Sequence, residues 1–451
     1  MFRELVIPEI RELIKDKDFR SLKEFLKDCH PSDIADLLEG LSDEEAGILF
    51  LLLSREQAGD TFTEMEHSKQ EAILKKLNER QIRDLILELE PDERTELFEE
   101  LPGNITKMLL ELLPPEERKE TLQILAYPEN TVGRLITPEY VAVKPYWTVK
   151  EAMDYIRKNG KDAETIDMVY VIDDNGKLID DIPIRRFILA NPDDKVEKLM
   201  DRHFVSISAY EDQEKAVQLV KQYDLIALPV TDSHGVLIGI VTVDDIIDVM
   251  EEESTEDFRK LGGVGLTEEE DLVTNIKEMS FRSLYRGRMP WLLVLLFMNI
   301  FSGGVISFFE GTIAKYAVLV TFLPVIIATA GNAGSQSSTL MVRALAIGNV
   351  RLNDWARLIG KELLISIALG ITAGVGIFFI GIARGGIKIS IIVFLTMVVN
   401  VIVGSLLGMS LPFIFTKLKR DPATASTPLI TTICDIVGTS VYFIIATSIL
   451  Y

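Results

Sequence analysis

The last third of the chain consists of five long apolar runs separated by short, mostly basic connections. The runs lie at about 291–309, 317–347, 363–382, 389–415 and 425–451. An α-helix needs roughly 20 such residues to cross the hydrocarbon core of a bilayer. A helix satisfies its own backbone hydrogen bonds, so it is a form in which such a run can lie in lipid. We therefore expect an all-α membrane domain of five helices in residues 289–451.

The basic residues between the runs indicate which ends of these helices face the cytoplasm. Ten basic residues fall on one side of the expected bundle: Arg282, Arg286, Arg288, Arg343, Arg351, Arg357, Lys361, Lys417, Lys419 and Arg420. The other side holds only three: Lys315, Arg384 and Lys388. Because basic connections tend to stay in the cytoplasm, we expect a multi-pass protein of the cell (inner) membrane. Its N-terminus is predicted to be cytoplasmic and its C-terminus to lie outside.

The charge is divided unequally along the chain. Residues 291–451 hold 10 Lys+Arg and 5 Asp+Glu, a net of +5, so with −22 overall residues 1–290 carry −27. Nucleic acid and anionic membrane surfaces repel such a region, whereas divalent cations are its natural small partners. Solubility alone is the alternative explanation for the acidic front. The two cysteines, Cys29 and Cys434, are far apart and indicate neither a disulfide framework nor a thiolate metal site.

Residues 1–130 are predicted to form an acidic, all-α domain. Their apolar residues recur every three or four positions, as on one face of a helix. Ser42-Asp-Glu-Glu45 and Ser54-Arg-Glu-Gln57 fit the capping box, which satisfies the first free amides of a helix. We identify no arrangement of nucleophiles or metal ligands here, and expect no enzymatic activity. Further helix starts are indicated by Asn78, Pro91 and Pro114-Pro115.

Residues 131–250 contain an internal repeat of strand, turn and helix. Residues 140–156 align with residues 204–220, and in each copy a pair of strands follows. These strand pairs turn at Asn175-Gly176 and His234-Gly235, where a positive φ is needed. The pattern therefore predicts a tandem α/β domain.

The tandem resembles a pair of CBS domains, and Gly239-Ile-Val-Thr-Val-Asp-Asp-Ile246 is among the more specific strings for that family. The resemblance implies regulation of the attached domain, with ATP as the candidate cofactor of the pair. The first copy departs from the pattern at Ile179-Asp-Asp-Ile-Pro-Ile184, where a glycine and a Thr/Asp pair are usual. This departure argues against nucleotide binding.

A long acidic helix is expected from Asp244 to about Lys260, inside a connecting segment of residues 244–288. Its carboxylates recur at i, i+3 and i, i+4, which gathers Asp245, Asp248, Glu252 and Glu256 on one face. Like charges at these spacings destabilise an isolated helix by a few tenths of a kcal/mol per pair. We therefore expect a metal ion, facing basic side chains or diffuse counterions against this face.

Asp435 is the only acidic residue in the fifth apolar run. An acid at the centre of a membrane helix costs about 2.5–3.5 kcal/mol on insertion scales, so such residues usually face a water-filled path and bind an ion or proton. Thr431 and Thr432, one turn earlier, add oxygen atoms that suit a hard divalent cation. A carboxyl held neutral or hydrogen-bonded between helices is the alternative.

The second apolar run is polar at its centre. Pro324 is expected to interrupt it, and residues 330–339 place Asn332 and Gln336 at membrane depth. Because irregular or polar segments are tolerated there only when buried or lining water, we expect this stretch to line a pore. Packing between helices is expected at two G-x-x-x-G spacings, Gly370–Gly374 and Gly404–Gly408.

The order of these parts resembles the MgtE family of magnesium channels over essentially the whole chain. The strings that carry the resemblance are Gly331-Asn-Ala-Gly-Ser-Gln336, Arg343-Ala-Leu-Ala346, Asp421-Pro-Ala-Thr-Ala-Ser426 and the segment around Asp435. The family implies a homodimer with one pore on its two-fold axis, lined by the second and fifth membrane helices. Asp435 from both subunits would hold Mg²⁺, with Asn332 and the carbonyl of Thr431 beside it.

The family resemblance further implies that cytoplasmic Mg²⁺ binds the front half of the chain and closes the pore. The matching positions are Asp92, Asp212, Glu214, Asp224, Asp245, Asp248, Glu253, Glu256, Asp257 and Asp421. The expected function is thus a magnesium-selective influx channel gated by Mg²⁺. Two alternatives stay open: a cation-coupled exporter of Mg²⁺, Co²⁺, Ni²⁺ or Mn²⁺, and a membrane-anchored sensor whose CBS pair reads nucleotide.

Overall fold

The computed structural model describes residues 2–101, 103–161, 163–265, 281–346 and 348–451. Contacts divide the chain into two compact units, Met1–Met250 and Glu251–Tyr451, which are treated separately below. The expected linker residues 266–280 lie outside the described residues.

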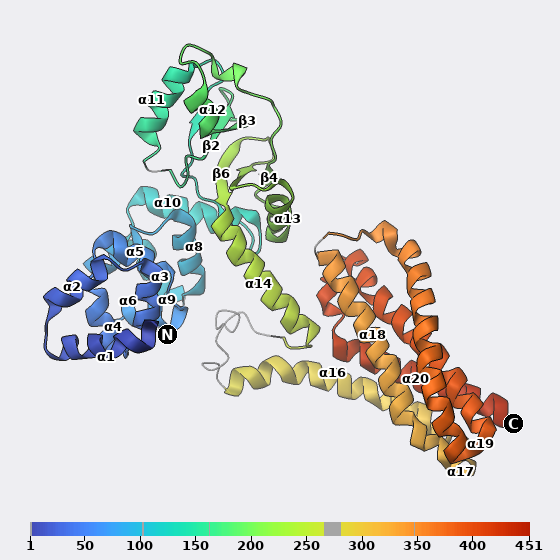
Figure 1. Cartoon of the computed structure of the whole chain (residues 1–451). Coiled ribbons are helices and arrows are strands. Elements are labelled where there is room, and N and C mark those ends of the chain that lie inside the picture. The colour runs from blue at the N-terminus through green and yellow to red at the C-terminus, as the bar shows by residue number, and fades with distance from the viewer. Residues whose placement is uncertain (1, 102, 162, 266–280, 347) are drawn as a thin grey trace. The chain divides into compact units, whose positions relative to one another are not determined.

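The first unit begins with short helices that follow one another closely (Figure 1). Glu45 N–H donates to Ser42 Oγ and Ser42 N–H donates to Glu45 Oε2, so the predicted capping box is confirmed. At Ser54 the return bond comes from the hydroxyl to Gln57 Oε1 rather than from the backbone. These helices are α1 (Phe2–Lys15), α2 (Phe19–Lys27), α3 (Pro31–Glu39), α4 (Asp43–Phe50), α5 (Arg55–Thr63), α6 (His67–Leu74), α7 (Glu79–Ile86), α8 (Pro91–Glu100), α9 (Gly103–Leu112) and α10 (Pro115–Ile124).

One leucine-rich core holds these helices together, and the buried side chain of Arg94 joins α7, α8 and α10. Phe62 and Ile86 are fully buried in this core. Arg94 is only 3% exposed and donates to the carbonyls of Ile86 (3.0 Å) and Leu89 (2.8 Å). Its third contact is an ion pair with Glu117 at 2.9 Å. Arg94 thereby ties α7, α8 and α10 into one rigid group.

Two similar α/β repeats follow, as the sequence predicts. In each, the first strand is parallel to the second and the second is antiparallel to the third. Gly176 and Gly235 both have φ +81° in the predicted turns. The strands are β1 (Ala142–Val143), β2 (Met168–Ile172), β3 (Leu178–Pro183), β4 (Ile207–Ser208), β5 (Ala227–Thr231) and β6 (Leu237–Thr242). The helices are η1 (Val132–Leu135), α11 (Val149–Asn159), α12 (Ile184–Leu189), η2 (Val196–Lys198) and α13 (Gln213–Tyr223).

The two repeats are joined symmetrically at their turns. Leu178 N–H donates to the Gly235 carbonyl and Leu237 N–H donates to the Gly176 carbonyl, both at 3.0 Å. A shared apolar cluster that includes Tyr170 lies between the sheets. The pair is followed directly by α14 (Val243–Leu261), which is the predicted acidic helix.

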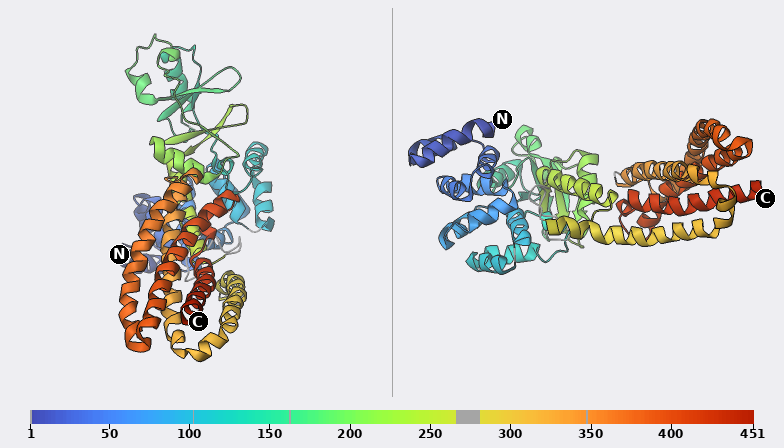
Figure 2. Two further views of the ribbon diagram at one scale, coloured as in Figure 1. Left: turned by 90° about the vertical axis from the view of Figure 1, so that its right-hand side faces the viewer. Right: turned by 90° about the horizontal axis from the view of Figure 1, so that it is seen from below.

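The second unit contains the apolar helices, which run side by side in Figure 2. Pro324 stands in the first turn of α18, where proline is tolerated, and the helix continues unbroken through residues 330–339. The apolar run therefore changes next to Pro324, from the 3₁₀ segment Ala317–Phe322 to the α-helix, while the polar stretch that follows is regular helix. The elements are α16 (Phe281–Phe308), α17 (Glu310–Lys315), η3 (Ala317–Phe322), α18 (Leu323–Ala346), η4 (Leu352–Asp354), α19 (Trp355–Lys417), η5 (Pro422–Thr424) and α20 (Thr427–Leu450).

Four of these helices are long and apolar enough to cross a membrane, and α19 is a hairpin of two limbs. Its 63 residues would extend for about 95 Å if straight, roughly three times the hydrocarbon thickness. At Gly386 the backbone turns with φ 75° and ψ −176°, a conformation open to glycine. A Cβ on Gly370 would lie 2.9 Å from Val398, and one on Gly381 would lie 2.8 Å from Ser390, so residues 355–385 and 387–417 pack antiparallel.

The second limb of α19 packs closely against α18. Side chains on Gly404 and Gly408 would collide with the carbonyls of Ala330 and Gly334, respectively. On another side, a Cβ on Gly334 would lie 3.0 Å from Ile430 of α20. The small residues thus allow three helix backbones to meet at one level, which confirms the packing role predicted for Gly404–Gly408.

Candidate ion pathway and acidic clusters

The contacts between α18 and α20 place Asn332 and Asp435 at about the same level. Ala330 lies opposite Gly438, whereas Gly334 lies opposite Cys434 and Ile430, so the two helices are antiparallel. Residue 332 therefore stands midway between these contacts, level with residues 434–435. The register of the antiparallel helices α18 and α20 therefore brings Asn332 and Asp435 to one level.

Both side chains remain accessible in the single chain. Asn332 and Gln336 are exposed on α18, and Asp435 is half-buried on α20. Within the part of the chain that the structure describes, none of these three side chains makes a hydrogen bond or ion pair. The alternative in which Asp435 is hydrogen-bonded between helices of one chain is thus not supported. Polar groups left open at membrane depth require water, an ion or a second subunit beside them.

Thr431 and Thr432 stabilise the first turn of α20. Their hydroxyls donate to the Pro428 carbonyl at 3.0 and 2.8 Å. Thr431 also packs against Gly331, where a Cβ would lie 3.1 Å from its Cγ2. Both hydroxyl protons are therefore donated within α20, and only the oxygen lone pairs of Thr431 and Thr432 could face an ion.

Asn400, in the second limb of α19, is a buried polar residue that sequence reasoning missed. It is 1% exposed and donates through Nδ2 to the Gly438 carbonyl at 3.1 Å, one helical turn beyond Asp435. Its Oδ1 is buried with no hydrogen-bond partner among the described residues. The sequence does carry a signal for this residue, since Asn400 is the one amide side chain in the apolar run 389–415. Asn400 fixes the position of α20 next to Asp435.

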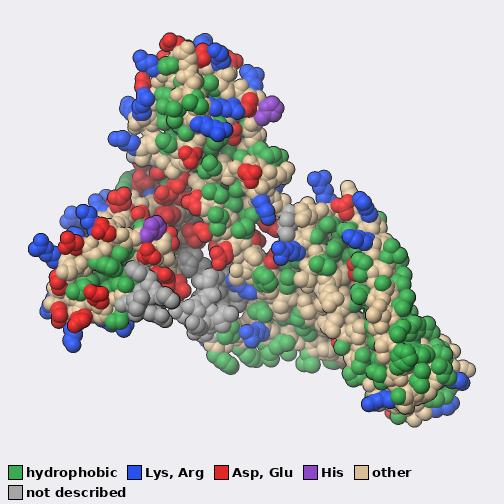
Figure 3. All heavy atoms as spheres, viewed as in Figure 1, with side chains coloured by type: hydrophobic (Ala, Val, Ile, Leu, Met, Phe, Trp, Pro, Cys, Tyr) green, Lys and Arg blue, Asp and Glu red, His purple; other side chains and the backbone are tan. Residues whose placement is uncertain are grey.

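An acidic cluster lies in the first unit where α8 meets the start of α14. Figure 3 shows Asp and Glu side chains gathered there. Asp92 is 8% exposed and its Oδ1 has no hydrogen-bond partner among the described residues. Asp245 accepts from the hydroxyl of Thr242 at 2.7 Å, which orients it at the start of α14. We define the cluster as Glu90, Asp92, Glu93, Glu164, Asp244 and Asp245 and call it the α8–α14 cluster.

Burial and acidic neighbours raise the pKa values of Glu90, Asp92 and Asp245 and so favour the neutral forms of these three carboxyls. Burial, together with the charges of Glu90 and Glu93, raises the pKa of Asp92 to about 7. Burial and the neighbouring Asp92 raise the pKa of Asp245 to about 7. The pKa of Glu90 rises to about 8 through burial and a hydrogen bond shared with Glu164. A cation would favour the ionised forms. Sequence reasoning identified Asp92 and Asp245 but missed their acidic neighbours.

The three acidic positions expected on α13 are not brought together within one chain. Asp212 is the N-cap of α13 and accepts from the amide of Glu214, which lies in the first turn. Asp224 is the C-cap, in the left-handed conformation. Twelve residues of helix separate the two caps by about 18 Å, too far for one ion.

The second half of α14 belongs to the second unit, where it carries a lysine between acidic residues. Lys260 Nζ is 2.6 Å from Asp421 Oδ2 and also pairs with Glu256. Burial and the charge of Asp421 raise the pKa of Asp257 to about 6. Lys260 belongs to α14 itself, one turn after Glu256, so it is not one of the facing basic side chains expected against this helix. Asp248 is exposed and Glu253 is partly buried on the same helix.

Among the described residues, no group of three or more His, Cys, Asp or Glu side chains is arranged to hold one metal ion. The acidic positions are therefore not a preformed cage. The α8–α14 cluster still suits a cation, because its buried carboxylate oxygens on Asp92 and Glu164 have no hydrogen-bond donors in the described chain.

Family models match most of the chain. The model described as a divalent cation transporter, MgtE, matches residues 323–445. The MgtE intracellular N domain matches residues 29–130, and the CBS domain matches residues 132–193 and 196–252.

Relatives at full length carry the same description. The chain is 34% identical over 444 residues to the magnesium transporter MgtE of Thermus thermophilus, with 97% of either chain covered. It is 32% identical over 440 residues to the magnesium transporter MgtE of Bacillus subtilis, covering 97% of this chain and 96% of that one.

Two solved structures resemble the front half. One is the cytosolic domain of the Mg²⁺ channel MgtE in complex with ATP, with 33% identity and a TM-score of 0.52. It covers 54% of this chain and 99% of that one. The soluble part of a magnesium transporter matches with 29% identity and a TM-score of 0.52, covering 56% of this chain and 99% of that one.

Proposed function

Because the chain belongs to the MgtE family of magnesium transporters, we propose that it is a channel for Mg²⁺ influx that cytoplasmic Mg²⁺ closes. In this proposal each limb of α19 crosses the membrane, which gives five spans with the N-terminus inside and the C-terminus outside. The membrane is the cell (inner) membrane. The soluble residues 1–130 and 131–250 and the connecting segment 244–288 then face the cytoplasm, ahead of the membrane residues 289–451.

The observation that carries the proposal is Asp435, a half-buried carboxylate at the level of Asn332 with no recorded partner in the described chain. A second copy related by a two-fold axis along α18 and α20 would cover the exposed Asn332 and Gln336. It would also bring two Asp435 carboxylates towards one axis, where a divalent cation relieves their repulsion. The proposal therefore includes a homodimer with a single pore.

The proposed ligands suit hydrated Mg²⁺. Mg²⁺ prefers octahedral oxygen ligands at about 2.0–2.1 Å and gives up its water reluctantly. Paired Asp435 carboxylates, Asn332 and the Thr431 carbonyl can hold the ion through its waters without replacing all of them. Discrimination against other divalent ions would then depend on the size of the hydrated ion.

Gating is proposed to use the acidic positions outside the membrane. When Mg²⁺ is scarce, ionised carboxylates in the α8–α14 cluster would repel one another, because the acidic neighbours of Asp92 and Asp245 disfavour their charged forms. Bound Mg²⁺ would draw Asp92 and Asp245 together. The acidic pair Asp257 and Asp421 is proposed to respond in the same way, with Asp248 and Glu253 contributing on α14. Asp212 with Glu214, and Asp224 at the other end of α13, are proposed to serve separate ions. Closure requires that Mg²⁺ bind the closed state more tightly than the open one.

ATP is proposed as a ligand of the CBS pair on the likeness to the solved cytosolic domain that holds ATP. In the first repeat, Asp180 accepts from the amides of Asp201 and Arg202 at 2.9 and 3.0 Å, so its carboxylate is already engaged. We therefore assign ATP a role in tuning the pair and no catalytic role.

The test is Mg²⁺ entry into proteoliposomes with a Mg²⁺-sensitive dye inside, at low and at millimolar Mg²⁺ on the face that carries the N-terminus. Downhill flux that needs no opposing ion gradient and falls at millimolar Mg²⁺ is expected. Flux that requires an opposing proton or sodium gradient would instead favour the coupled exporter. Absence of any divalent flux, with nucleotide binding intact, would favour the membrane-anchored sensor.

A further inference from the structure

Lys260 lies among three carboxylates of the second unit, although it belongs to the acidic helix α14. Its ammonium is 2.6 Å from Asp421 Oδ2, and it also pairs with Glu256, one turn earlier on the same helix. Burial and the charge of Asp421 raise the pKa of Asp257, whereas the charge of Lys260 lowers it. These four side chains therefore interact with one another, and we call Glu256, Asp257, Lys260 and Asp421 the Lys260 cluster.

Both carboxylate oxygens of Asp421 are engaged in this arrangement. Oδ1 accepts from the amide of Ala423 at 2.7 Å, which begins η5, and Oδ2 accepts from Lys260. The side chains of Lys260 and Asp421 are each 32% exposed, so water reaches the pair only in part. Mg²⁺ requires oxygen ligands in nearly octahedral geometry. An ion that takes Oδ2 as a ligand must therefore displace the ammonium.

The end of α14 is held in place by contacts that do not involve Lys260. Gly263, with φ 68°, packs so closely that a Cβ there would collide with Trp291 of α16 and lie 3.4 Å from Pro428 of α20. The carboxylates of the cluster therefore stay close together when the lysine charge is removed. Their mutual repulsion then remains for another cation to relieve.

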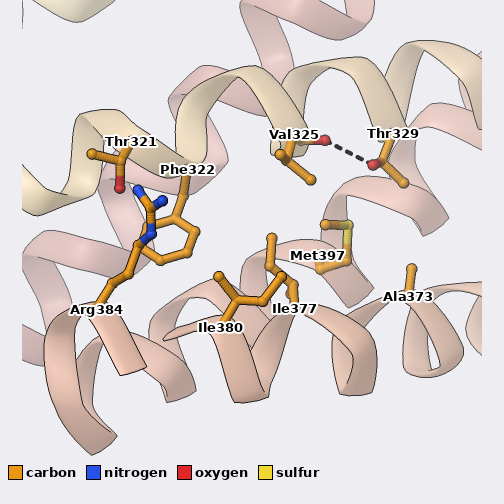
Figure 4. Close-up of a pocket in the computed structure, with 9 residues that line it drawn as sticks. All are labelled: Thr321, Phe322, Val325, Thr329, Ala373, Ile377, Ile380, Arg384 and Met397. Atoms are coloured by element: carbon orange, nitrogen blue, oxygen red, sulfur yellow. Dashed lines mark hydrogen bonds between the residues drawn. The ribbon is translucent and has the colours of Figure 1, made fainter. Parts of the chain in front are cut away.

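The acidic surroundings of Lys260 differ from those of another cation in the same unit. Arg384 lines a groove between the start of α18 and the first limb of α19, and the other lining residues are apolar or threonine (Figure 4). Burial alone would lower the pKa of Lys260, but its hydrogen bonds to Asp421 and Glu256 raise that pKa to about 12. Lys260 is therefore a permanent cation among acidic partners at neutral pH.

We propose that the Lys260 ammonium competes with Mg²⁺ for Asp421 and Glu256, and that it thereby raises the Mg²⁺ concentration at which the Lys260 cluster binds the ion. The inference rests on the proposed function, in which Asp257 and Asp421 respond to Mg²⁺, and adds the residue that sets the threshold of this response. Within the described residues, these carboxylates are not arranged around one metal ion, as expected while the ammonium lies between them. The flexible lysine side chain can swing away when Mg²⁺ binds.

The test is Fe²⁺-directed hydroxyl-radical cleavage of the full chain in detergent, in which Fe²⁺ replaces Mg²⁺ and cuts the backbone beside the bound ion. The Fe²⁺ concentration for half-maximal cleavage within residues 255–261 and 419–423 reports the affinity of this cluster, and excess Mg²⁺ should suppress the cleavage. Lys260→Gln should lower that concentration by about three- to fivefold, the effect of one partly exposed ion pair.

Two control variants separate local competition from diffuse attraction. Lys260→Arg keeps the charge and should leave the half-maximal Fe²⁺ concentration within about twofold of wild type. Lys419→Gln removes an exposed cation two positions before Asp421, with no ion pair in the described chain, and should also change it less than about twofold.

Equal half-maximal concentrations in wild type and Lys260→Gln would overturn the proposal, and so would an equal fall in Lys419→Gln. Loss of cleavage at both segments in Lys260→Gln would overturn it too, because the lysine would then hold the segments together instead of competing with the ion. Flux separates these outcomes from the proposed function. Closure by Mg²⁺ in a wild type that shows no cleavage beside the cluster would overturn this inference alone, whereas wild-type flux that Mg²⁺ does not reduce would contradict the proposed gating.

Discussion

Removing a buried carboxylate from the α8–α14 cluster should stabilise the protein when Mg²⁺ is absent. Asp92 is 8% exposed, and its pKa is raised from 3.8 to about 7 by burial and by Glu90 and Glu93. One pKa unit corresponds to about 1.4 kcal/mol, so about three units set an upper limit near 4 kcal/mol on the cost of ionising Asp92 in the folded chain. Asp92→Asn removes the charge but keeps a buried polar group, so we expect a gain of about 1–2 kcal/mol in free energy of unfolding above pH 7 without Mg²⁺.

The sign of the pH dependence follows from the raised pKa. Between pH 4 and 7 the folded state binds more protons at Asp92 than the unfolded state, so the stability of the wild type falls as pH rises through this window. The difference between Asp92→Asn and wild type should therefore be near zero at pH 4 and reach its full value above pH 7. Mg²⁺ should stabilise the wild type more than the variant, because the variant loses a ligand.

The assay is thermal unfolding of the full chain in detergent with EDTA, combined with hydrogen exchange of α8 and the first half of α14. A gain of 1–2 kcal/mol corresponds to roughly 2–8 °C in a unit of this size. Asp36→Asn, at an exposed acid in the same helical layer, is the matched control and should change little. An Asp92→Asn variant that is less stable in EDTA at pH 8 would refute the reasoning, since it would mean that the carboxylate is favourably paired.

Three further predictions concern the second unit. Asn400→Leu removes the hydrogen bond to α20, worth about 1 kcal/mol, and should lower Mg²⁺ flux at unchanged expression. Asn400→Gln should retain part of the flux. Equal flux in the wild type and both variants would assign Asn400 to packing alone. Lys260→Gln frees Asp421 from its ion pair, so Mg²⁺ no longer competes with Lys260 for this carboxylate. Closure, measured as the fall of flux, should then need less Mg²⁺. Closure that needs more Mg²⁺ would contradict this competition. Gly408→Val forces a side chain against the Gly334 backbone. The overpacking costs about 1–3 kcal/mol or more and should reduce the folded fraction in size-exclusion chromatography. A normal elution profile would show that the helices separate easily.

Much of the fold could be predicted because periodicity reports local structure. The helical front, the α/β repeats, the acidic helix α14 and the apolar helices all follow from patterns spaced within one element. The change expected at Pro324 lies at the junction of η3 and α18, but the proline stands inside the first turn of the helix. Sequence alone does not fix where a helix begins to within a turn.

The site was predicted less completely, because its contacts join residues far apart in the chain. Asp435 and Asn332 were identifiable as polar residues in apolar runs, but their common level depends on the packing of Gly334 and Gly438. Glu164 could not be linked to Asp92 by any spacing, since folding alone brings them close. Likewise, the pairing of Lys260 with Asp421 crosses 161 positions and leaves no local signal.

The central claim is that the charge of Asp435 holds the ion in the pathway. The most direct measurement is Mg²⁺ flux into proteoliposomes at low Mg²⁺ for wild type, Asp435→Asn and Glu310→Gln. Glu310→Gln removes an acid of the same unit at the start of α17, away from the helix pair that carries Asp435. The account predicts near-complete loss of flux in Asp435→Asn, with folding and dimerisation intact, and normal flux in Glu310→Gln. Flux in Asp435→Asn equal to that of wild type would contradict it.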